Sequence, residues 1–149
     1  MRWWVLRNGL FVVGVLLLTG CGSSTGPDVD LSSAFVTGPV EVTLQQGEDL
    51  LVPGTVLRVS LAAVAEDSRC PSDVVCVWEG NAKVELGIAA GSGPTSTLLL
   101  NTALEPRVAE WNGIRVTLVD VTPYPVSTQA ILAGDYLVTL RLEREPQSP

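Results

Sequence analysis

The 149-residue sequence contains no histidine and only one lysine, Lys83. The lack of histidine excludes the commonest general base and the usual Ser-His and Cys-His catalytic arrangements. Lys83 falls on the solvent phase of its predicted strand, which argues against a Ser-Lys dyad or a Schiff base. Glycine-rich phosphate loops and calcium-binding loops are absent as well. The sequence therefore predicts a protein that is not an enzyme, with no catalytic residue and no cofactor.

Carboxylate pairs are the catalytic alternative that this composition leaves open. Glu48 precedes Asp49 and Glu66 precedes Asp67. Glycosidases use two carboxylates on opposite sides of the substrate, and neighbours on one loop are a poor match to that geometry. A carboxylate-dependent hydrolase is kept as an alternative hypothesis.

The N-terminus has the pattern of an export signal. Residues 1–20 carry two arginines and no acidic residue, followed by the apolar run Leu10–Leu18 and the small residues before Cys21. The run is shorter than the roughly 20 residues that a membrane-spanning helix needs, although an N-terminal anchor helix is the alternative interpretation. The segment Leu18-Thr19-Gly20-Cys21 resembles the lipobox of bacterial lipoproteins.

The lipobox resemblance implies cleavage before Cys21 and attachment of a diacylglycerol to its thiol. The bilayer would then be the first partner, reached through acyl chains that hold the protein on the membrane. Gly22 rather than Asp follows the cysteine, which implies the outer membrane in a Gram-negative cell and the outside of the cell membrane otherwise. Composition then divides the chain into a tether (21–34), one domain (35–145) and a tail (146–149).

Removal of the signal makes the charge more negative. Two of the nine basic residues leave with it, so seven face sixteen acidic ones and the balance falls from −7 to −9. Such a surface repels nucleic acid and anionic lipid headgroups, so no nucleic-acid partner is expected. The excess is compatible with solubility alone or with cationic partners.

Cysteine usage follows from the same assignment. With Cys21 lipidated, Cys70 and Cys76 remain as a pair, and a disulfide is the default for two cysteines in an exported protein. A metal site is the alternative, but it would need two further soft or imidazole ligands that the chain lacks. The sequence predicts the disulfide and no metal.

Alternation of apolar and polar residues predicts strands throughout the mature chain. The segments with this pattern are 40–44, 57–63, 82–88, 114–118 and 136–142. Val119 and Val121 follow Leu118 out of phase, which predicts a bulge near Asp120. Asn112-Gly113 and residues 90–94 predict hairpin turns, and residues 126–133 a short helical turn before Gly134. The expected fold is an all-β antiparallel sandwich of about seven or eight strands, with a small closed barrel as the alternative.

The stretch from Glu66 to Ala82 is the most varied chemically. Its Asp-Ser-Arg-Cys-Pro run, second cysteine, Trp78 and Gly80 resemble a group of small bacterial secreted proteins and lipoproteins that have no assigned activity. The residue between Trp and Gly is often Ala in that group, whereas this chain has Glu79. The resemblance implies a β-fold outside the cytoplasm and no particular reaction.

Two interpretations of this loop are open. In the structural one, Arg69 forms an ion pair with Asp67 and Glu66, and Trp78 packs on the disulfide or caps the core. In the functional one, Asp67, Arg69, Trp78 and Glu79 belong to a candidate binding loop. Trp111, at the Asn-Gly hairpin, is either an exposed contact residue or packed on its own hairpin.

Three functional hypotheses follow. The first is a non-catalytic envelope module that binds a protein, peptide or glycan through loops at one end of the sandwich. The second is a protease inhibitor that presents the loop at residues 66–80, and the third is the carboxylate-dependent hydrolase.

Overall fold

The computed structural model describes residues 38–144. The predicted signal, Cys21, the whole tether and residues 35–37 of the predicted domain lie outside this range, as do residues 145–149 with the predicted tail. The described part contains eight strands and one short 3-10 turn. They are β1 (Val40–Gln45), β2 (Asp49–Leu51), β3 (Leu57–Asp67), β4 (Ala82–Ala90), β5 (Ser96–Asn101), β6 (Val108–Trp111), β7 (Ile114–Thr122), η2 (Ala133–Asp135) and β8 (Leu137–Arg144).

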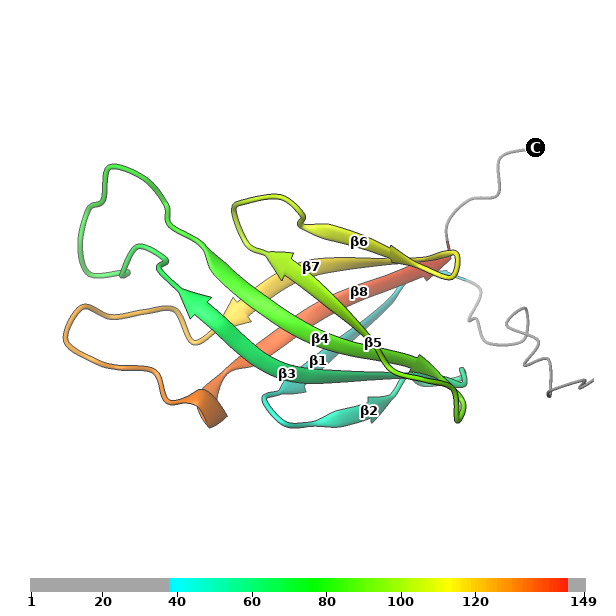
Figure 1. The fold of residues 1–149 in the computed structure, drawn as a ribbon. Coiled ribbons are helices and arrows are strands. Elements are labelled where there is room, and N and C mark those ends of the chain that lie inside the picture. Colours follow the sequence, from blue (N-terminus) through cyan, green and yellow to red (C-terminus); the bar gives the residue numbers. More distant parts are fainter. Residues whose placement is uncertain (1–37, 145–149) are drawn as a thin grey trace, which may run out of the picture.

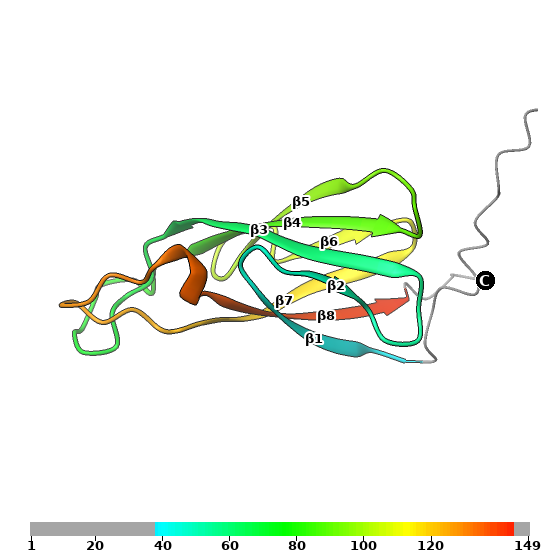
Figure 2. The same ribbon diagram turned by 90° about the horizontal axis from the view of Figure 1, so that it is seen from below.

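The strands form two antiparallel four-stranded sheets that pack face to face (Figures 1 and 2). One sheet has the order β1-β8-β7-β6 and the other β2-β3-β4-β5. The sheets do not close on each other, so the predicted antiparallel sandwich is confirmed and the closed barrel is wrong.

Alternation along the strands builds the core. Each sheet turns one face inward, and the apolar phase of every long strand lies on that face. The largest fully buried side chains come from both sheets: Leu44, Leu57, Leu61, Leu86, Ile88, Leu100, Ile114 and Leu140. The phase slip in β7 is the predicted bulge, because the register with β8 shifts between Leu118 and Asp120. The slip lets Leu118 and Val121 both face the core.

The β6–β7 hairpin confirms the Asn-Gly turn. Asn112 has φ 48° and Gly113 has φ 75°, the positive values that a type I′ turn requires at both central positions. The β4–β5 hairpin falls at residues 91–95, also as expected. Trp111 is partly buried and packs against the core, which settles its role in favour of packing.

The helical turn predicted at residues 126–133 is wrong. These residues form an irregular loop with an isolated bridge between Val126 and Gln129, and the 3-10 turn comes later, at η2. Backbone groups at the start of this loop are not available for a helical turn, because they form hydrogen bonds to the β3–β4 loop. The carbonyl of Pro125 accepts from the amide of Ser72, and the amide of Ser127 donates to Asp73.

The two ends of the sandwich differ. The β3–β4 loop (68–81) and the β7–β8 loop (123–136) project side by side from one end (Figures 1 and 2). The start of β1 lies at the opposite end, together with the end of β8. Any tether that precedes residue 38 therefore joins the domain at the end remote from the β3–β4 loop.

Candidate functional site

The β3–β4 loop is a narrow ribbon fastened at its base and across its middle. The amide of Ser68 donates to the carbonyl of Asn81 (2.7 Å), and that of Cys70 donates to the carbonyl of Glu79 (2.8 Å). Cys70 and Cys76 form the predicted disulfide, with Cα atoms 5.9 Å apart. The two arms are therefore joined by backbone hydrogen bonds and by a covalent link.

Arg69 fastens this loop to the opposite sheet. Its side chain is buried, with 5% of the residue exposed. Nε and Nη2 donate to the two carboxylate oxygens of Asp67 at 2.9 and 2.7 Å. The guanidinium also donates to the carbonyls of Val121 and Pro123 at the end of β7, and it lies 4.9 Å from the ring centre of Tyr124. Arg69 thus connects the end of β3 to the start of the β7–β8 loop.

The predicted ion pair is confirmed for Asp67 and wrong for Glu66. Glu66 faces outward and pairs with Lys83 across the β3–β4 ladder, with Nζ 3.1 Å from Oε1. Successive residues of a strand point to opposite faces of the sheet, so these adjacent carboxylates cannot serve one arginine. The same geometry separates them as a catalytic pair.

The environment of Asp67 explains its charge state. Burial alone would raise the pKa of this carboxyl, but hydrogen bonds and the charge of Arg69 outweigh burial and hold the pKa below its usual value. The hydroxyl of Tyr136 also donates to Asp67 Oδ2 (3.1 Å). Burial and the neighbouring carboxylate raise the pKa of Tyr136 in turn. Asp67 is thus an ionised, fully engaged structural group.

Asn81 is a structural residue that the sequence analysis missed. Its amide nitrogen donates to Asn101 Oδ1 (2.9 Å), and its oxygen accepts from the amides of Ala103 and Leu104. Asn101 continues the network to the carbonyls of Glu105 and Pro106. These bonds hold the β5–β6 loop against the start of β4. The only available signal was an asparagine directly after the glycine of the motif.

A recess of about 280 Å³ lies between the β3–β4 and β7–β8 loops. Asp67, Arg69 and Tyr136 line it near the sheets, and Pro71, residues 125–127 and residues 129–131 supply its sides. The polar groups of the first three already bond to one another and to the β7 backbone. These three polar side chains are therefore already engaged, which makes the recess a weak candidate for recognition.

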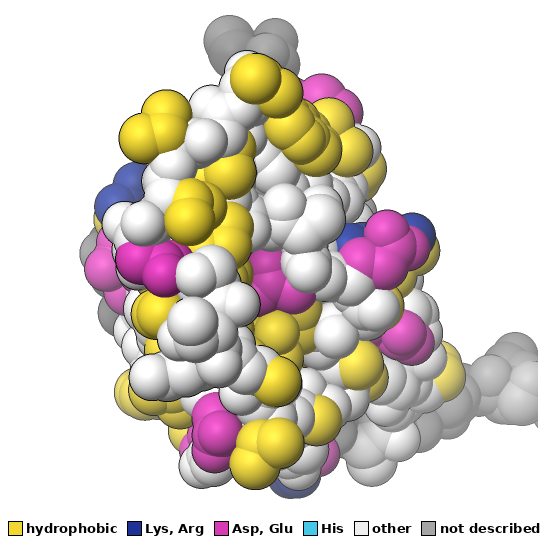
Figure 3. All heavy atoms as spheres, turned by 90° about the vertical axis from the view of Figure 1, so that its left-hand side faces the viewer, with side chains coloured by type: hydrophobic (Ala, Val, Ile, Leu, Met, Phe, Trp, Pro, Cys, Tyr) yellow, Lys and Arg dark blue, Asp and Glu magenta, His cyan; other side chains and the backbone are white. Residues whose placement is uncertain are grey.

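The tip of the loop, which we define as residues 74–79, contrasts with its base. Val75 and Val77 are fully exposed (100% and 104%), and Trp78 is 54% exposed. Trp78 does not cap the core, so that prediction is wrong. Figure 3 looks onto this end of the molecule, where hydrophobic side chains are spread with acidic ones between them and few basic ones. Of the four predicted binding residues, Asp67 and Arg69 lie inside and Trp78 and Glu79 outside.

No protein family, curated protein or solved structure matches the chain. Within residues 38–144, no three His, Cys, Asp or Glu side chains are grouped so that they could hold a metal ion. The same range contains no helix of the length and hydrophobicity needed to cross a membrane.

Proposed function

We propose that the protein is a lipid-anchored, non-catalytic module of the bacterial envelope that binds another protein through the tip. The observation that carries the proposal is the exposure of Val75, Val77 and Trp78 on a loop whose base is rigidly held. The predicted signal and lipobox support the location, and the engaged state of Asp67 speaks against carboxylate chemistry at this end.

The energetics favour binding by the tip. Burying one valine side chain contributes about 1.5–3 kcal/mol, and tryptophan is among the residues that most often dominate an interface. Ordering a mobile loop would reduce that gain. Here the disulfide and the Arg69 contacts have already ordered the backbone, so less entropy is lost on binding.

The direction of the tip favours a partner beyond the protein's own membrane. The start of β1 lies at the opposite end of the sandwich (Figure 1). β3 alone has 11 residues, and at about 3.3 Å per residue it spans about 36 Å. A chain anchored at Cys21 would therefore present the tip away from the anchor.

The charge of the loop limits which kinds of partner it can bind. Residues 70–82 contain no Lys or Arg, whereas Asp73 and Glu79 are exposed. An anionic bilayer would be repelled, since such surfaces recruit basic segments. The complementary surface is a protein with an apolar pocket and a basic rim.

Photo-crosslinking tests this proposal. With a photo-reactive amino acid at position 75 of the full-length protein in its own envelope, we expect a discrete protein adduct. A second substitution, Val77→Asp, should reduce that adduct about tenfold, because a charge in the pocket costs at least 1.4 kcal/mol. The adduct is measured by immunoblotting.

The matched control uses Leu51, a hydrophobic residue on β2 that is 53% exposed. A photo-reactive residue there should give no such adduct, and Leu51→Asp should leave the adduct from position 75 intact. Identical adducts from both positions, or an adduct insensitive to Val77→Asp, would show that the tip is not the contact surface.

Protease inhibition is a second candidate, favoured by the same rigid, protruding loop with exposed valines. The tip contains no basic residue, so it cannot fill the specificity pocket of a trypsin-like protease. Its valines suit a protease whose specificity pocket takes small aliphatic side chains. We expect inhibition of an elastase-type protease by the full-length protein, its loss in Val75→Asp, and no effect on trypsin. Undiminished elastase rates at micromolar protein would discard this candidate.

A further inference from the structure

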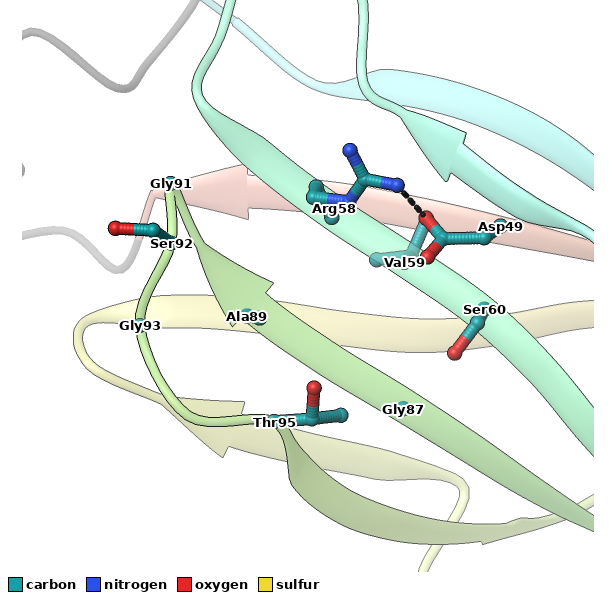
Figure 4. Close-up of a pocket in the computed structure, with 10 residues that line it drawn as sticks. All are labelled: Asp49, Arg58, Val59, Ser60, Gly87, Ala89, Gly91, Ser92, Gly93 and Thr95. Atoms are coloured by element: carbon teal, nitrogen blue, oxygen red, sulfur yellow. Dashed lines mark ion pairs between the residues drawn. The ribbon is translucent and has the colours of Figure 1, made fainter.

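The sheet β2-β3-β4-β5 carries a trench on its outer face, near the β4–β5 hairpin (Figure 4). Its volume is about 150 Å³. Gly87 and Ala89 of β4 form the floor. Both are buried although they lie on the outward phase of the strand, where Lys83 and Glu85 precede them. The polar outer face of β4 thus gives way to two small residues.

Position 87 has no room for a side chain, because Ser60 and Thr95 close in over it. A Cβ atom there would lie 2.5 Å from Ser60 Oγ and 3.0 Å from Thr95 Cγ2. The φ of Gly87 is not in the left-handed region, so its backbone does not require glycine. Glycine at this position therefore lets the side chains of Ser60 and Thr95 approach the floor of the trench closely.

Polar groups converge on this space from both sides. Figure 4 shows the Ser60 and Thr95 hydroxyls above the floor, from β3 and from the segment before β5. Neither hydroxyl hydrogen-bonds to another residue of the range 38–144. Arg58 and Asp49 close one side as an ion pair of 3.0 Å whose side chains are about half exposed. The lining offers donors and acceptors with no net charge.

We propose that this trench binds one residue of a neutral saccharide. A volume of about 150 Å³ is of the order of a single sugar ring, and polyols satisfy mixed donors and acceptors. An apolar ligand finds little apolar lining here, and because Asp49 and Arg58 are paired, the lining offers a charged ligand no net charge of opposite sign. Without an aromatic platform, affinity depends on hydrogen bonds and is about millimolar. The site is independent of the tip.

Saturation-transfer NMR on the full-length protein tests the assignment, with glucose, galactose and N-acetylglucosamine as probes. We expect transfer to at least one sugar at millimolar concentration. Gly87→Val displaces the side chains of Ser60 and Thr95 that line the trench and should remove the transfer. Ala62→Val places the same side chain on the exposed outer face of β3 outside the trench and should retain it.

A second variant protects the test against misfolding. Thr95→Val keeps the shape of an exposed side chain and removes its hydroxyl, so we expect affinity to fall by about threefold to tenfold with the fold unchanged by circular dichroism. The proposal is overturned if none of the sugars shows transfer, if both Gly87→Val and Thr95→Val retain it in full, or if acetate or a methylammonium ion binds in the trench and the sugars do not. Each outcome leaves the tip proposal unaffected.

Discussion

Replacing Arg69 with alanine is expected to lower the free energy of unfolding by about 3–5 kcal/mol, the usual cost of removing one partner from a buried ion pair. The substitution deletes four side-chain hydrogen bonds. It also leaves the carboxylate of Asp67, whose side chain is 10% exposed, without its cation. Urea unfolding followed by circular dichroism measures the change in midpoint.

Arg58 provides the matched control. Its pair with Asp49 has a similar distance, 3.0 Å, but both side chains are about half exposed, and exposed pairs contribute about 0–1 kcal/mol. Arg58→Ala should therefore cost less than about 1 kcal/mol. Comparable losses for the two variants would mean that Arg69 does not hold the loops together.

The pH dependence provides a second measurement. Because the folded pKa of Asp67 lies below its ordinary 3.8, the pair stabilises the native protein above that pH and loses its contribution as the pH falls through the lowered value. In the Arg69→Ala variant the arginine no longer offsets the effect of burial, so the pKa of Asp67 should rise instead. The contribution of Asp67 to acid sensitivity should then change sign, and an unchanged acid limb would contradict this account.

Most of the motif between residues 66 and 82 has a structural role, which is to hold loops in place. Arg69 holds the β7–β8 loop, Asn81 holds the β5–β6 loop, and Cys70 and Cys76 hold the β3–β4 loop to itself. Three loops at one end of the sandwich are thereby fixed relative to each other. Tip residues such as Val75 and Val77 have no structural task, which is why the tip rather than the whole motif is assigned to binding.

The sequence predicted the parts of the fold that depend on local pattern. Strand phases, the bulge at Asp120 and the Asn112-Gly113 turn follow from the period of two and from turn chemistry. The alternating pattern assigns no segment to β2, β5 or β6. The edge strands β2 and β6 carry too few residues for a period to show, and the three consecutive leucines of β5 do not alternate with polar residues.

Long-range contacts set the limit for the site. Arg69 bonds to Val121 and Pro123, which are 52 and 54 positions away, and no local pattern encodes that reach. The sequence shows that Arg69 has acidic neighbours, but it does not show that one of them, Asp67, is buried beside it. For the same reason the sequence leaves three places open for Trp78: on the disulfide, over the core or in a binding loop. Its exposure depends on how far the ribbon projects beyond the sheets.

Gly80→Ala is the other substitution with a large expected effect, a loss of about 4 kcal/mol or more. Gly80 has φ +74°, and a Cβ atom there would lie 1.9 Å from the carbonyl oxygen of Ser68 and 2.7 Å from the Cα of Arg69. Both are backbone atoms of the opposite arm, so no side-chain rotation can relieve the overlap. The arms must separate, which disrupts the hydrogen bonds at the base of the loop and the position of Arg69.

Gly113→Ala isolates the part of this loss that is due to φ. Gly113 has nearly the same φ, +75°, and its Cβ would meet no atom within 4 Å. That variant should cost only about 1–2 kcal/mol, the penalty of the left-handed conformation. The difference between the two unfolding free energies measures the close approach of the two arms. If alanine costs the same at both positions, the arms do not need glycine at 80, and rigidity at the base of the tip cannot rest on their contact.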